Sequence, residues 1–155
     1  MNKRQSVRLV RQKTSSDCAP CCLTMLTGLP YRKVIALIGD TFHPEKGMLE
    51  TVKGLERLGL VREKKIPVKG LSGAYRIEPV DFMEIRRQYE ISAQFFKDQL
   101  WGRRALLSVP SLNNPGGFHM VYWHYDRIFD PSTKKTYERF FDLKPEEIII
   151  FMERE

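Results

Sequence analysis

The chain has 155 residues, of which 42% are hydrophobic and 29% charged, and its net charge is +7. This composition excludes an intrinsically disordered chain, and the length excludes a mini-protein that depends on disulfides or metals. We expect a single domain over residues 1–155, because this length suits one hydrophobic core. No apolar run reaches the roughly 20 residues that a membrane span requires, so we expect no span.

The first thirteen residues contain five basic residues and no acidic residue. Such an arm can attract an acidic partner, a membrane surface or nucleic acid. No nucleic-acid-binding motif accompanies it, so we expect a solvated arm and no nucleic-acid partner. The next apolar run is interrupted by Pro20 and Thr24, which does not fit a signal peptide. The three cysteines lie within five residues and cannot join distant segments, which indicates a reducing compartment. With no signal peptide predicted, we expect a cytoplasmic location.

In chain order, the apolar spacing of the first half predicts a strand, three helices and a second strand. These elements cover residues 6–12, 18–27, 30–38, 48–58 and 60–68. A glycine follows each of the three helices, as expected at a helix end.

The second half predicts one or two helices within residues 80–101 and then mainly strands. The strands cover residues 104–109, 137–141 and 147–152, together with a hairpin over 118–130. Helices come first and a mostly antiparallel sheet follows, which indicates an α+β fold with N-terminal helices packed on a C-terminal sheet.

Cys18 is expected in the first turn of the helix over 18–27, after the N-cap candidates Ser16 and Asp17. The partial positive charge of a helix N-terminus stabilises a thiolate, which is the reactive form of cysteine. Cys18 is therefore the candidate nucleophile. Cys21 and Cys22 lie further along the same helix, and we interpret them as core residues.

The predicted hairpin supplies a base and an orienting acid for this nucleophile. With a two-residue turn at Tyr125–Asp126, Asp130 lies opposite Val121 and diagonal to His119. A His and an Asp side chain can bridge such a diagonal. Cys18, His119 and Asp130 thus form a candidate catalytic triad. His124 falls on the other parity of the strand, and we interpret it as a surface residue.

Several motifs resemble one known family. They are Gln12 with five residues between it and Cys18, the run Asp17–Met25, the run Lys46–Thr51 leading to Leu58–Leu60, and His119 with Asp130–Pro131. With these motifs the chain resembles the bacteriocin-processing, double-glycine leader cysteine peptidases of the papain-like superfamily. The segment 62–104 matches that family poorly.

The resemblance implies a papain-like fold and a peptidase that cleaves after small or glycine residues of a peptide or protein. It implies that Cys18, His119 and Asp130 are catalytic and that Gln12 supplies an oxyanion-hole amide. It also implies a stand-alone peptidase domain, because many family members carry a transporter that this chain lacks. Two departures stand beside the nucleophile: Ala19 replaces the usual Gly and Cys21 the usual Ala.

The same triad serves three reactions, and the leaving amine distinguishes them. An α-amine makes the enzyme a peptidase, a lysine side chain an isopeptidase, and ammonia a glutamine deamidase. No cofactor is expected. No metal is expected either, because Cys18, Cys21 and Cys22 without a nearby His do not have zinc-site spacing. Oligomeric state stays open.

Two other classes of function remain open. Cys18-Ala19-Pro20-Cys21 has the Cys-x-Pro-Cys form of a thiol–disulfide oxidoreductase, although the polar residues before it do not predict the buried strand such sites follow. A non-catalytic peptide-binding module on the same fold is the other alternative.

Overall fold

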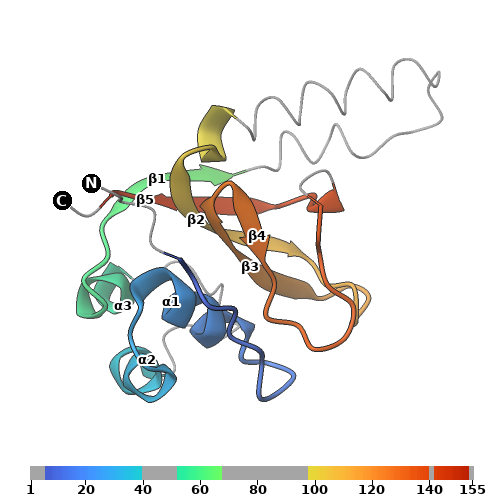
Figure 1. Cartoon of the computed structure of the whole chain (residues 1–155), viewed down its shortest axis with the longest axis horizontal. Helices are drawn as coiled ribbons and strands as arrows, with labels where there is room; N and C mark the ends of the chain where they lie inside the picture. The colour runs from blue at the N-terminus through green and yellow to red at the C-terminus, as the bar shows by residue number, and fades with distance from the viewer. Residues whose placement is uncertain (1–5, 40–51, 68–97, 140–141, 154–155) are drawn as a thin grey trace.

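The computed structural model describes residues 6–39, 52–67, 98–139 and 142–153. Within these residues three helices precede most of the sheet (Figure 1). In chain order the elements are α1 (Cys18–Thr27), α2 (Tyr31–Ile38), α3 (Val52–Arg57), β1 (Arg62–Pro67), β2 (Arg103–Pro110), β3 (Phe118–Tyr125), β4 (Arg127–Phe129) and β5 (Glu147–Phe151).

The five strands form one sheet in the order β1-β5-β2-β3-β4, and every neighbouring pair is antiparallel. The three helices lie together beside the sheet (Figure 1), and α1 packs directly on β3. Helices against an antiparallel sheet confirm the predicted α+β class.

The sheet buries apolar side chains on both faces, because residues along a strand alternate between its two sides. One face packs against the helices and contributes Leu106, Met120, Tyr122, Ile149 and Phe151. The other face contributes Ala105, Leu107, Val109, Val121, Trp123, Ile148 and Ile150, and is covered by Leu100, Tyr137 and Leu143. The continuous apolar run of β5 follows from this double burial.

α1 begins and ends where the sequence predicts. Gly28 ends it in the left-handed conformation, with φ 75°, and the Gly28 N–H donates to the carbonyl of Thr24 at 2.9 Å. The buried guanidinium of Arg104, from β2, donates to the Leu26 carbonyl at 3.2 Å. A cation at this end of a helix complements its dipole, so Arg104 ties the end of α1 to the sheet.

The β3–β4 hairpin has the predicted two-residue turn. Its register pairs Tyr122 with Phe129 and His124 with Arg127, which leaves Tyr125 and Asp126 as the turn. Tyr125 adopts φ 58°, as a tight hairpin turn requires. Continuing this register beyond Phe129 sets the next residue opposite Val121, as predicted.

The other described elements follow the prediction to within a few residues, with α2 starting at Tyr31, β1 at Arg62 and β5 ending at Phe151. Parts of two predicted helices, 48–51 and 80–97, lie outside the described residues.

Two predicted strands are wrong within the described residues. Residues 6–12 form no strand; their valines pack against the helical core, so their apolar spacing serves packing and not strand pairing. Residues 137–139 form no strand either. The backbone N–H of Tyr137 donates to the Asp130 carboxylate at 2.7 Å and is therefore not available to a sheet.

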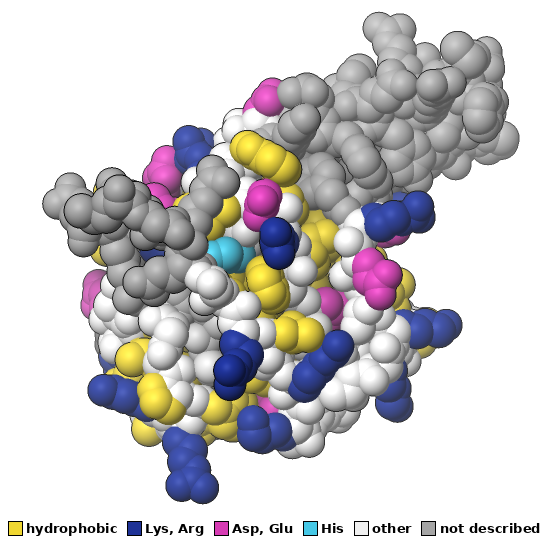
Figure 2. All heavy atoms as spheres, viewed as in Figure 1, with side chains coloured by type: hydrophobic (Ala, Val, Ile, Leu, Met, Phe, Trp, Pro, Cys, Tyr) yellow, Lys and Arg dark blue, Asp and Glu magenta, His cyan; other side chains and the backbone are white. Residues whose placement is uncertain are grey.

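Lys and Arg side chains are spread over the molecular face in Figure 2, with neutral and hydrophobic atoms between them. Across the parts of the chain that the structure describes, no single helix has both the length and the apolar character to cross a membrane. Only α1 and α2 taken together pass that test, as a pair bent by 112°.

Candidate active site

Cys18 is the first residue of α1 and is only 4% exposed. Its thiol lies near enough to the His119 side chain to contribute to the raised pKa of that histidine. One helical turn further on, the Cys22 thiol donates to the carbonyl oxygen of Met120 at 3.4 Å. Since Met120 directly follows His119, this buried contact fixes the start of α1 against the start of β3. The structure therefore brings Cys18 and His119, the predicted pair, close together.

His119 is bound on its other side by Asp130. The distance from Nε2 of His119 to Oδ1 of Asp130 is 2.6 Å, and the two side chains are 12% and 3% exposed. Burial alone would lower the pKa of His119, but hydrogen bonds to Asp130 and Cys18 outweigh it and raise the pKa to about 9. Because Asp130 binds Nε2, Nδ1 is the ring nitrogen that remains for an interaction with the thiol.

Asp130 is held as a carboxylate by the loop that follows β4. Its Oδ1 accepts the backbone N–H of Ser132 at 2.9 Å, and its Oδ2 accepts that of Tyr137 at 2.7 Å. Burial opposes ionisation, but the bond to His119 and these two N–H groups lower the pKa of Asp130 below its ordinary value. Asp130 is thus a fixed, charged hydrogen-bond partner of His119.

Gln12 reaches the site through its backbone. Its N–H donates to the Pro131 carbonyl at 2.8 Å, directly after Asp130 in the chain. Its side-chain Nε2 donates to the carbonyl of Thr14 at 3.1 Å. A side-chain amide carries two N–H groups, so this bond leaves one for a ligand oxygen. Arg11 strengthens the same junction by donating to the Ser132 carbonyl.

Asp17 has a larger part in the site than the sequence predicted. It precedes α1 as the expected N-cap residue, but its side chain makes no capping hydrogen bond. The carboxylate instead accepts hydrogen bonds from the backbone of Lys13 and Thr14 and from the Tyr31 hydroxyl. Burial would raise the pKa of Asp17, but these bonds together lower it. An acidic residue directly before the cysteine was the only sequence signal.

Cys21 and Cys22 are completely buried, as predicted for core residues. Burial, followed by the neighbouring charge of Asp17, raises the pKa of Cys21 to about 12. Burial also raises the pKa of Cys22 well above the ordinary thiol value. Both are therefore neutral thiols at physiological pH. Over the described ranges, no group of three His, Cys, Asp or Glu side chains could hold a metal ion.

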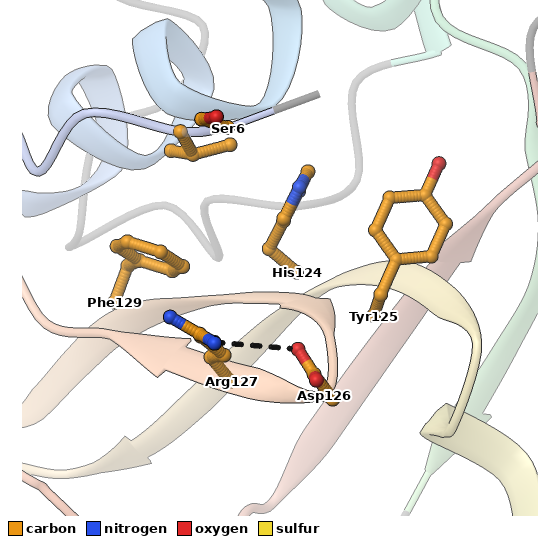
Figure 3. A pocket seen from close by; sticks show the side chains of 7 residues that line it. Ser6, His124, Tyr125, Asp126, Arg127 and Phe129 are labelled. Carbon is orange, nitrogen blue, oxygen red and sulfur yellow. Dashed lines mark ion pairs between the residues drawn. The ribbon is translucent and has the colours of Figure 1, made fainter. Parts of the chain in front are cut away.

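The prediction for His124 is wrong, because this residue is half-buried and not a plain surface residue. Its Nδ1 lies 2.7 Å from the Tyr122 hydroxyl, and its ring packs edge-on against Phe129. His124 also lines a pocket of about 290 Å³ at the turn end of the hairpin (Figure 3). Figure 3 shows the ring directed from the hairpin toward Ser6, away from the Asp126–Arg127 ion pair. The pocket contains none of the predicted catalytic residues.

No protein-family model matches this chain, and no curated protein matches it significantly. What the site can do therefore follows from its own geometry. A thiol, an imidazole and a carboxylate stand in series at a helix N-terminus, with backbone and side-chain N–H groups close by. This arrangement is suited to nucleophilic attack on a carbonyl group.

Proposed function

We propose that this chain is a cysteine-dependent amide hydrolase with a papain-like fold. The observation that carries the proposal is the series Cys18–His119–Asp130, in which the imidazole is hydrogen-bonded to the carboxylate at 2.6 Å and lies beside the Cys18 thiol. A buried His–Asp bond has a stabilising role in any protein. A cysteine at a helix start on the other side of that imidazole adds the chemistry of an activated nucleophile.

In the proposed reaction, His119 accepts the thiol proton and the Cys18 sulfur forms a bond to the carbonyl carbon of the substrate. The carbonyl π electrons move to oxygen, where the Cys18 backbone N–H and the Gln12 amide stabilise the negative charge. As the tetrahedral intermediate collapses, His119 donates its proton to the leaving nitrogen. Water, deprotonated by His119, then cleaves the thioester. Asp130 orients the imidazole and stabilises its charged form.

We propose a peptidase as the reaction, with glycine or another small residue before the cleaved bond. This choice depends on the resemblance of the Gln12–Met25 and His119–Pro131 motifs to double-glycine leader peptidases. An isopeptidase or a glutamine deamidase would use the same four groups, so the leaving amine is a matter for substrate assays.

The two other classes have less support. An oxidoreductase needs a second reactive thiol, whereas Cys21 is buried and its pKa is raised to about 12. No strand leads into Cys18 within residues 6–17. A binding module does not need a thiol–imidazole–carboxylate series. The presence of this series in the chain favours a catalytic function.

The first test is alkylation of each cysteine by iodoacetamide at pH 6, followed by mass spectrometry. We expect Cys18 to react faster than a free cysteine, because the His119 imidazole can accept its proton. His119→Ala should remove this advantage. His124→Ala is the matched control, because it deletes a half-buried histidine of the same strand, and it should leave the rate unchanged.

A peptide vinyl sulfone ending in glycine tests the enzyme reading directly. Parent protein should be labelled at Cys18, and both Cys18→Ala and His119→Ala should lose the label. If Cys18 reacts equally fast in parent protein and His119→Ala with both reagents, the proposed function is wrong.

A further inference from the structure

We propose that Asp17 is a positioning residue that, together with Tyr31, holds the turn carrying Gln12 beside Cys18. This inference rests on the proposed amide-hydrolase function. Asp17 is a buried carboxylate outside the proposed triad, and the inference assigns it a role.

The backbone and the side chain of Asp17 serve different structures. Its carbonyl oxygen accepts the N–H of Cys21 at 3.2 Å and so starts α1. Its carboxylate does not cap the helix. It turns back onto the preceding turn, although Asp is one of the preferred capping residues. The side chain is therefore committed to the turn.

The carboxylate accepts hydrogen bonds from that turn through both oxygens. Oδ2 accepts the N–H of Lys13 at 2.9 Å, and Oδ1 accepts that of Thr14 at 3.1 Å. The Tyr31 hydroxyl, from the first residue of α2, donates to Oδ2 at 3.0 Å. Asp17 is 6% exposed, so water contributes little to satisfying these groups. A buried carboxylate with three such donors has little freedom to move.

Gln12 is held at both ends, its side chain by this turn and its backbone by the segment after Asp130. The Gln12 side chain donates to the Thr14 carbonyl, and the N–H of Thr14 is one of the groups that Asp17 binds. The Gln12 backbone is bonded to Pro131, beside Asp130. Asp17 therefore links the nucleophile, its neighbour in the chain, to the amide proposed for the oxyanion. A residue that acts in this way is a positioning residue, and we expect its effect to pass through Gln12.

Two reagents separate this effect from damage to the Cys–His pair. Iodoacetamide forms an S–C bond to Cys18 as iodide leaves, and no oxyanion develops. A peptide aldehyde ending in glycinal also forms an S–C bond, but its carbonyl π electrons move to the oxygen and the thiol proton passes to His119. Only the aldehyde adduct presents an oxygen to Gln12.

The test compares parent protein with Asp17→Asn, Gln12→Ala and the double variant. In Asn, an NH₂ group replaces one acceptor oxygen and faces N–H or O–H donors. The side chain therefore loses part of its hydrogen bonding to the turn. We expect Asp17→Asn and Gln12→Ala each to weaken aldehyde binding by about tenfold or more. The rate of Cys18 alkylation should change by less than about twofold, since the His119 contact is intact. The double variant should bind no more weakly than the weaker single variant.

Tyr31→Phe is a second, milder variant in case Asp17→Asn does not fold. It deletes one of the three O–H and N–H donors to the carboxylate and keeps the ring on which the Lys13 ammonium lies, 4.1 Å from the centroid. It should weaken aldehyde binding in the same direction by a smaller factor. Asp126→Asn is the matched control, because Asp126 is an acidic residue at the far end of β3, and it should bind the aldehyde like parent protein.

Three outcomes overturn the inference while the proposed function stands. The first is parent-like aldehyde binding by Asp17→Asn, or by Tyr31→Phe if only that variant folds. The second is a double variant whose loss equals the product of the two single losses, which means independent action. The third is an equal loss of alkylation and aldehyde binding in Asp17→Asn. Parent protein with neither aldehyde binding nor His119-dependent alkylation removes the proposed function, and this inference with it.

Discussion

β3 carries two histidines, His119 at its start and His124 near its turn, whose surroundings are alike in geometry and different in chemistry. Both are half-buried, and each has a ring nitrogen 2.6–2.7 Å from an oxygen of another side chain. The oxygen facing His119 belongs to the carboxylate of Asp130, whereas the oxygen facing His124 belongs to the phenol of Tyr122.

The two histidines differ in the charge of the side chain that each one contacts. The Asp130 carboxylate, with the Cys18 thiol on the other side, raises the pKa of His119 to about 9 against the effect of burial. Burial raises the pKa of Tyr122, so the phenol stays uncharged and offers His124 no negative charge. A short hydrogen bond therefore does not by itself mark a candidate catalytic histidine. His119 is the candidate because its partner is ionised and a cysteine lies on the far side of its ring.

The largest effect is expected from removing the charge that distinguishes His119. Asp130→Asn keeps the shape of the side chain but weakens its hold on the imidazolium, and we expect vinyl sulfone labelling to slow by about 100-fold or more. The imidazolium supplies the proton that this addition requires, so labelling of parent protein should fall as pH rises through about 9. In the variant this fall should begin at lower pH.

Labelling rates between pH 5 and pH 10 measure both effects. Asp126→Asn, in the hairpin turn, is the matched control and should keep the parent profile. An Asp130→Asn profile with an unchanged alkaline limit would mean that Asp130 does not hold the imidazolium.

An intermediate effect is expected on stability. The pKa of His119 is about 9 in the folded protein against 6.5 as an ordinary value, so folding favours its proton. Its contribution is complete below about pH 6.5 and is lost as pH rises through about 9, a difference of about 3 kcal/mol at most. Urea unfolding at both ends of this window measures the loss.

Two glutamine variants assign that pH dependence to one histidine. His119→Gln should flatten the dependence between these pH values, because no titrating imidazole remains beside Asp130. His124→Gln should retain the slope of parent protein. A slope that persists in His119→Gln would assign the pH dependence to another group.

The smallest effect is expected at the other histidine. Tyr122→Phe keeps the buried ring but deletes the hydroxyl that faces Nδ1 of His124. We expect a loss of about 1 kcal/mol in the free energy of unfolding, as for one buried hydrogen bond, and an unchanged rate of Cys18 labelling. Urea unfolding and vinyl sulfone labelling of the same sample measure the two quantities. A slower label would show that the two ends of β3 are coupled.

The sequence was sufficient wherever local chemistry decides the structure. The start and end of α1 follow from the residues that flank it, with Gly28 as its left-handed stop. The hairpin register follows from its two-residue turn, and that register predicted that His119 and Asp130 would meet. Both elements are short in sequence, so the distances between their side chains depend on few backbone angles.

Tertiary packing alone decided how these local elements combine. The Cys22–Met120 contact spans 98 residues and sets Cys18 against His119, and no periodicity in the sequence specifies such a contact. Asp17 was predicted as a helix cap, but the Tyr31 hydroxyl and the preceding turn compete for its carboxylate. The side-chain burial of His124 depends in the same way on neighbours from other elements. Spacing in a sequence predicts which residues share an element, whereas the partner of a polar side chain is decided by what packing brings within hydrogen-bonding distance.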